Sequence, residues 1–314
     1  MEVGYDQLST TRRMRVLSSP NILVCTDFKQ TSDFALKSAE TIRKKVGGKI
    51  YVIHISDIPV NWDWVGQESS FLLNNEKLTA DLLKSLKKMM ADQIRRCEVD
   101  CTTDVSVGPT YEGIMESIKK KKPDLVLMGH KGHSHEVFSL GGIASKVVAS
   151  AHVPVLVIKK LLYYPLGKVA GLVETTENMK PIILATEEFS FLLSAQAEVI
   201  SLWKNVTSQF YNLAPVEKVH PLLDLRQEVK DAILNKIRTE ITEDLDEHTK
   251  CRVRVEITEE KQVAYHLVKI LEEDLVDLVI MKRHQRKLIE KIFIGSETRR
   301  MLEIFNGNVL VLPP

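Results

Sequence analysis

Residues 124–132 read DLVLMGHKG, and residues 277–285 read DLVIMKRHQ. In both stretches a continuous apolar run follows an aspartate, which is typical of a strand buried on both faces of a parallel sheet. Similar segments surround the two copies in the same order. NILVCTDF precedes the first copy and VPVLVIKK follows it, whereas PIILATEEF precedes the second and NVLVLPP follows it. We therefore interpret the chain as a duplicated domain.

Between these apolar runs the spacing changes to that of amphipathic helices. Ala35, Ala39, Ile42 and Val46 recur at steps of three and four residues, and the pair Gly47-Gly48 then ends the predicted helix. Because strands alternate with helices, each half is predicted to be a five-stranded α/β domain with a parallel sheet covered by helices on both faces. A second helix is predicted to carry an apolar face that ends in a polar residue: Leu78, Leu82, Leu86, Met89 or Met90, and Gln93.

The repeat also suggests domain boundaries. We expect the first domain at residues 1–160, a linker at 161–179 and the second domain at 180–314. The linker is predicted because Leu161 to Met179 has no sustained period and contains one proline and two glycines. On this interpretation Leu23–Asp27 corresponds to Ile183–Glu187, which becomes the first strand of the second domain.

Composition excludes several classes of protein. The 314 residues are 44% hydrophobic and 27% charged, which suits a globular protein with buried cores. The 43 basic and 42 acidic residues give a net charge of +1, so neither nucleic acid nor a membrane surface is expected as a partner. Four cysteines are too few for a disulfide scaffold, and we expect a cytoplasmic protein.

Two glycine-containing turns follow the buried strands of the first half. The fourth predicted strand ends in Gly129-His-Lys-Gly132, and Gly141-Gly142 then opens the last helix. In parallel sheets ligands bind beyond the carboxyl ends of the strands, where glycine allows close backbone approach and a helix N-terminus attracts phosphate. Asp27 ends the first strand and is placed to accept hydrogen bonds from ribose hydroxyls. This arrangement favours a nucleotide.

Taken together, ILVCTDF, DLVLMGHKG, the glycine pair and VPVLVI resemble the universal stress protein family. The resemblance covers both halves, so the chain is similar to a tandem member. It implies two flavodoxin-like domains with strand order 3-2-1-4-5, which pair through their last strands. Some members bind ATP through the pattern G-x2-G-x9-G-[ST], with helix-opening hydroxyls on the phosphates and the aspartate of the first strand on the ribose.

Carried over residue by residue, the resemblance implies an adenine-nucleotide site in the first half. Asp27, Gly129 and Gly132 match the family pattern, but eight residues instead of nine separate Gly132 from Gly141. Gly142 replaces the phosphate-binding hydroxyl residue, and Ala144 replaces a second residue that is often hydroxylated. The other implied site residues are Cys25, Thr26, Ile55 and Met128, through adenine and sugar contacts, with His133 and Ile143 in the phosphate loop and helix.

The second half departs from the pattern in a complementary way. Its spacing of nine residues and its Gly295-Ser296 pair are intact, but Lys282 and Gln285 stand where glycines belong. Glu187 is expected in place of the aspartate of the first strand. Side chains at both glycine positions crowd a diphosphate, so this half is interpreted as a degenerate copy that keeps the fold.

These observations leave two functions open. The first is a regulatory adenine nucleotide, ATP with magnesium, in the first domain; the second is a nucleotide-free stress protein that acts through unknown protein partners. A slow ATPase is a weaker alternative, since no catalytic constellation is present. A zinc site built from His54, His130, His133 and His135 lacks an orienting carboxylate, so no metal site is predicted. We also expect the two halves to form an intramolecular pseudo-dimer, with a further homodimer possible.

Overall fold

The chain was studied as a computed structural model. The structure describes residues 18–57, 76–130, 142–174, 178–204, 228, 230–239, 251–258, 263–283 and 296–314. These residues form two compact units, and the boundary between them lies between Leu162 and Tyr163. Each unit is a parallel α/β domain.

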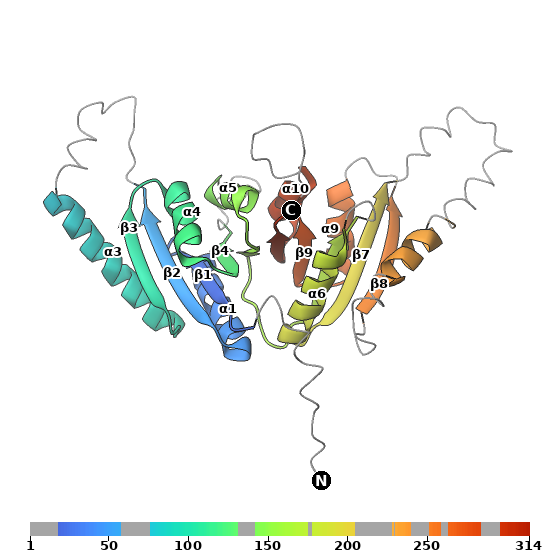
Figure 1. Cartoon of the computed structure of the whole chain (residues 1–314), viewed down its shortest axis with the longest axis horizontal. Helices are drawn as coiled ribbons and strands as arrows, with labels where there is room; N and C mark the ends of the chain where they lie inside the picture. The colour runs from blue at the N-terminus through green and yellow to red at the C-terminus, as the bar shows by residue number, and fades with distance from the viewer. Residues whose placement is uncertain are drawn as a thin grey trace, which may run out of the picture. The chain divides into compact units, whose positions relative to one another are not determined.

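In the first unit the strand order is β3-β2-β1-β4-β5, as the resemblance implied, and all of the paired strands are parallel. Figure 1 shows α3 running along the outer strand β3, and contacts pair α1 with α3 and α4 with α5, so helices cover both faces of the sheet. The elements are β1 Asn21–Cys25, α1 Gln30–Val46, β2 Lys49–Ser56, α3 Glu76–Cys97, β3 Thr102–Val107, α4 Thr110–Lys121, β4 Leu125–Gly129, α5 Gly142–Ser150 and β5 Val155–Ile158.

Local chemistry explains how α1 begins and ends. The predicted helix stop is confirmed: Gly47 adopts a left-handed φ of 78° and its N–H donates to the carbonyl of Arg43. Three basic residues occupy the last turn, where they interact favourably with the helix dipole. Ala35, Ala39 and Ile42 are fully buried, so the spacing seen in the sequence marks the face that packs on the sheet.

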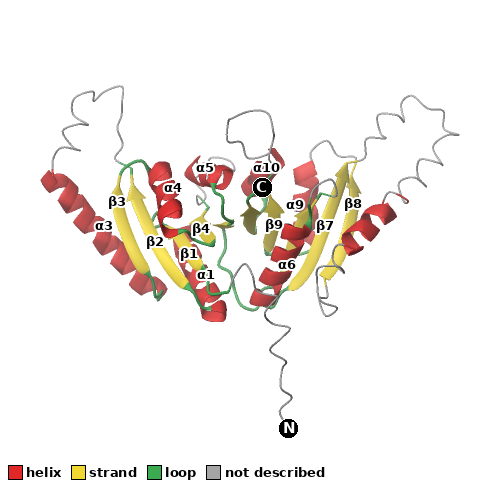
Figure 2. Cartoon of the chain, in the orientation of Figure 1, coloured by secondary structure: helices red, strands yellow, loops and turns green. Residues whose placement is uncertain are grey.

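The second unit repeats this architecture with strand order β10-β9-β6-β7-β8, again with parallel pairs. Its elements, coloured by type in Figure 2, are β6 Lys168–Val173, α6 Lys180–Leu193, β7 Gln196–Lys204, β8 Cys251–Thr258, α9 Val263–Glu273, β9 Leu278–Lys282, α10 Ser296–Ile304 and β10 Asn308–Leu312; residues 230–239 are also helical.

The start of the second unit differs from the prediction. Ile183–Glu187 lies inside the helix α6 and not in a strand, and the first strand is β6, within the predicted linker. The apolar residues of α6 resemble a buried strand, but Pro181 at its start favours a helix. Gly171, which suggested a linker, lies in β6, and glycine suits this position because a Cβ would clash with the Thr186 hydroxyl of the covering helix α6.

An equivalent pair of hydrogen bonds fixes the correspondence between the two units. The N–H of Asp124 donates to the carbonyl of Asn21 at 2.8 Å, and the N–H of Asp277 donates to the carbonyl of Lys168 at 3.0 Å. The two carboxylates accept in return from the N–H groups of Asn21 and Lys168, and that of Asp277 also accepts from Gly167. Asn21 and Lys168 are therefore equivalent, as the first residues of β1 and β6. Glu174, and not Glu187, then takes the position that Asp27 holds in the first unit.

Candidate functional site

The candidate site of the first unit lies where its strand order reverses. From β1 the chain continues to β2 and β3 on one side, and then returns to β4 and β5 on the other. The carboxyl ends of β1 and β4 are adjacent, because Cys25 pairs with Met128 in the register of the two strands. Ligands of parallel α/β sheets bind at such a switch point. Thr26-Asp27 and Gly129-His130 occupy it here.

Asp27 is held in place by the turn that leads into α1. Its Oδ1 accepts hydrogen bonds from the hydroxyl of Ser32 and from the backbone N–H of Lys29, the latter at 3.1 Å. Its Oδ2 lies 3.7 Å from the Lys29 ammonium, and the Asp27 side chain is 50% exposed. The carboxylate is therefore oriented by the protein on one side and faces solvent on the other.

Gly129 ends β4 directly against the start of α1. A Cβ at this position would lie 2.7 Å from the Thr31 hydroxyl, 2.8 Å from the Thr31 carbonyl carbon and 2.9 Å from the Ser32 nitrogen. Ser32 in turn bonds to Asp27, so the structure brings Gly129 and Asp27 together at one end of the sheet. Only glycine permits this close approach of two backbones.

The apolar residues of the predicted site are buried in the sheet. Cys25, Ile55 and Met128 are all at most 9% exposed. Ile55 packs under Gly113 of α4, where a Cβ would come within 2.6 Å of its side chain. Burial raises the pKa of the Cys25 thiol to about 12, so this thiol is neutral at physiological pH.

The phosphate side of the predicted site is described only from the start of α5. Gly142 begins this helix and is exposed, with open space where a Cβ would project. Ile143 is half-buried, and Ala144 is buried. Gly132, His133 and Gly141, like His135 of the zinc alternative, lie outside the described residues.

Sequence reasoning missed two residues of this region. Ser32 binds Asp27, and Gln93 of α3 binds Thr26 at 2.8 Å although 67 residues separate them. Gln93 is 1% exposed. Its place at the end of an otherwise apolar helix face was the signal that could have identified it, because a buried amide needs hydrogen-bonding partners.

The second unit carries different groups at the equivalent place. Lys282 ends β9 as Gly129 ends β4, and the exposed Glu174 follows β6 as Asp27 follows β1. Ser296 begins α10, whereas Gln285 and Gly295 lie outside the described residues.

The part of the chain that the structure describes contains no group of three or more His, Cys, Asp or Glu residues that could hold a metal ion. None of its helices combines the length and the apolar character that crossing a membrane requires.

Comparison with known proteins agrees with the duplicated fold. Two regions of the chain, residues 19–159 and 194–313, match the universal stress protein family. The chain is 35% identical over 144 residues to universal stress protein MJ0531 of Methanocaldococcus jannaschii, which covers 44% of this chain and 81% of that protein.

Solved structures show the same fold along nearly the whole chain. A functionally unknown protein, PA1789 of Pseudomonas aeruginosa, matches with a TM-score of 0.66 and 16% identity, covering 95% of this chain and 94% of that one. A universal stress protein of Archaeoglobus fulgidus matches with a TM-score of 0.61 and 13% identity, covering 93% of this chain and 98% of that one. With family matches in both halves, the chain belongs to the universal stress protein family.

Proposed function

We propose that the first unit binds an adenine nucleotide, ATP with magnesium, as a regulatory ligand. The observation that carries this proposal is the pair formed by Asp27 and Gly129 at the switch point of the sheet. Asp27 offers an oriented, half-exposed carboxylate, and Gly129 lets the start of α1, which orients that carboxylate through Ser32, pack directly against the end of β4.

Each group suits one part of a nucleotide. The exposed side of the Asp27 carboxylate can accept hydrogen bonds from ribose hydroxyls, and charge-assisted bonds of this kind are among the stronger ones in proteins. The start of α5 at Gly142, with open space where a Cβ would project, offers the positive end of a helix dipole to the phosphates.

Titration calorimetry with ATP and magnesium tests this proposal, together with mass spectrometry of any ligand released from the purified protein. We expect one nucleotide per chain, and we expect Asp27→Ala to weaken binding by roughly tenfold to a hundredfold. Glu174→Ala is the matched control, because it removes the equivalent carboxylate from the second unit. The proposal fails if millimolar ATP gives no heat and no nucleotide is released.

One observation favours a second function, in which the protein acts without nucleotide through protein partners. Neither Gly142 nor Ala144 carries a hydroxyl group, so neither side chain can donate a hydrogen bond to a phosphate. Phosphate would then be held there by backbone N–H groups alone. This function would be supported over the first if a pull-down recovers the same protein partner with wild type and with Asp27→Ala, and if calorimetry with ATP gives no heat.

A further inference from the structure

A series of hydrogen bonds runs from the surface of the first unit to the buried Thr26, in the turn that carries Asp27. Gln93 of α3 lies at its centre. Its Oε1 accepts from the hydroxyl of Thr26 at 2.8 Å, and its Nε2 donates to Oδ1 of Asp33 at 2.6 Å. Arg96, one turn further along α3, donates to both oxygens of Asp33. Gln93 thereby joins α3 to the end of β1 and to α1, at residues that precede it by 67 and 60 positions in the sequence.

The carboxylate of Asp33, at the outer end of this series, determines which group donates and which accepts in each of its hydrogen bonds. The Asp33 carboxylate, which already binds the Arg96 guanidinium, can only accept, so the amide of Gln93 must present its NH2 group to it. The Gln93 oxygen therefore faces Thr26, and the Thr26 hydroxyl must donate its proton to that oxygen. The lone pairs of the Thr26 hydroxyl are then left for another donor.

That donor is the backbone N–H of Phe28, which lies 3.0 Å from the Thr26 hydroxyl oxygen. Phe28 has a φ of 63°, a left-handed conformation that bulky residues rarely adopt. The ring of His54 packs against Phe28 with 4.2 Å between the ring centroids, and His54 Nδ1 lies 2.8 Å from the Thr26 carbonyl oxygen. An unfavourable turn is thus held on both sides of Asp27.

We propose that Gln93 is a positioning residue for nucleotide binding, which acts by fixing the Thr26-Asp27-Phe28 turn so that the Asp27 carboxylate faces the ribose hydroxyls. The inference rests on the proposed function. It adds that selectivity for the ribose depends on an amide of α3 that does not touch the ligand. Without Gln93, Thr26 loses the acceptor that orients its hydroxyl, and the turn loses its preferred geometry.

A purely structural role for Gln93 is the competing explanation, since a buried amide also helps to dock α3. The two roles differ in which nucleotide they affect. Positioning of Asp27 affects only ligands that carry ribose hydroxyls, whereas general loosening of the fold weakens ATP and 2′,3′-dideoxy-ATP by the same factor.

The experiment compares the dissociation constants of these two nucleotides by titration calorimetry on the full chain. We expect wild type to prefer ATP over dideoxy-ATP, and Gln93→Met to weaken ATP binding about tenfold while dideoxy-ATP binding changes less than about threefold. Thr26→Val removes the same hydrogen bond from its other end, and we expect it to reproduce this loss of preference if Gln93→Met folds poorly.

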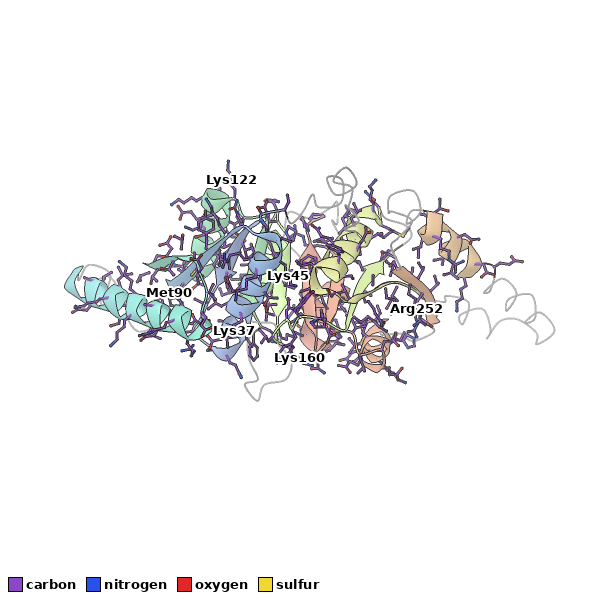
Figure 3. All side chains as sticks on the ribbon, turned by 90° about the horizontal axis from the view of Figure 1, so that it is seen from below. Lys37, Lys45, Met90, Lys122, Lys160 and Arg252 are labelled. Atoms are coloured by element: carbon purple, nitrogen blue, oxygen red, sulfur yellow. The ribbon has the colours of Figure 1, made fainter. Side chains whose placement is uncertain are left out.

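Met90→Leu is the matched control. Met90 is 2% exposed and lies one turn before Gln93 on α3, where Figure 3 labels it. We expect this variant to keep the preference for ATP whatever its stability. Equal losses for both nucleotides, or an unchanged preference in Gln93→Met, would overturn the inference and leave nucleotide binding intact. A wild type that binds neither nucleotide would overturn the proposed function and this inference together.

Discussion

Arg254 of β8 donates a hydrogen bond to the carboxylate of Asp274, just after α9, and the equivalent pair in the first unit has the opposite charges. There Lys121 ends α4 and lies 3.6 Å from the carboxylate of Asp104 on β3. Ile53 on β2 and Ile200 on β7 are equivalent residues, because they pair with equivalent residues of β1 and β6. Asp104 pairs with Ile53 and Arg254 pairs with Ile200, so Asp104 and Arg254 occupy equivalent positions on the edge strands. Both units therefore have an ion pair between the end of a helix and the edge strand, but the cation is on the helix side in the first unit and on the strand in the second.

The two pairs differ in burial, and we expect them to differ in energy. Both side chains of the Arg254–Asp274 pair are about three-quarters buried, whereas Asp104 is 58% exposed. We predict that Asp274→Asn lowers the free energy of unfolding by about 1–2 kcal/mol and that Lys121→Gln lowers it by less than about 1 kcal/mol. Urea denaturation measures both values. Equal costs, or a larger cost for Lys121→Gln, would contradict the prediction.

Glu198 on β7 is a buried carboxylate between two cations. It is 1% exposed, and neither of its oxygens has a hydrogen-bond partner among the described residues. Lys168 and Arg252 each lie 3.6 Å from it, and Arg252, labelled in Figure 3, is largely exposed. We predict that Glu198→Gln lowers the free energy of unfolding by about 1–3 kcal/mol, because Lys168 then loses its buried counter-charge.

The double variant Lys168→Met/Glu198→Met is the informative control for this prediction. Replacement of both partners by apolar side chains leaves no uncompensated buried charge, so we expect it to be more stable than Glu198→Gln in urea denaturation. A double variant that is less stable than the single one would show that the pair itself contributes net stability.

Two glycines at the candidate site offer a matched comparison. We predict that Gly129→Ala lowers the free energy of unfolding by about 1–3 kcal/mol and weakens ATP binding, because its Cβ meets backbone atoms of α1 that must shift. Gly142→Ala places its Cβ in open space at the start of α5, so we expect stability to be unchanged or to rise by up to about 1 kcal/mol. Thermal denaturation and calorimetry measure the two effects, and a neutral Gly129→Ala would show that α1 adjusts freely.

The buried thiol of Cys25 predicts a loss of stability in alkaline solution. Folding raises its pKa from 9.0 to about 12 by burial, so the protonated thiol stabilises the fold fully below pH 9. This contribution is lost as the pH rises from 9 to 12, because the unfolded chain releases the proton first. We expect wild type to lose about 1 kcal/mol more than Cys25→Val between pH 8 and pH 10 in urea denaturation. Parallel pH profiles for the two proteins would contradict this.

Much of the fold could be predicted from local patterns. The runs Ile22–Val24, Leu125–Met128 and Val155–Ile158 are buried strands, and Gly47 ends the first helix as its position suggested. The predicted site residues at the ends of β1 and β4 also lie together, because parallel strands bring their carboxyl ends to one edge of the sheet. The prediction failed at Ile183–Glu187, which was expected to be a strand and lies in the helix α6, and at Lys168–Val173, which was expected in the linker and forms the strand β6.

The sequence by itself determined the duplication, the α/β class and the chemistry offered at the strand ends, since apolar period and turn residues are local properties. Tertiary structure decided which apolar run of the second unit is a strand, because a buried helix and a buried strand can share the same composition. It also decided that Gln93 reaches Thr26 and Asp33. Such contacts depend on how α3 packs against α1 and β3, since the periodicity of α3 places Gln93 on its packed face but does not specify its partners.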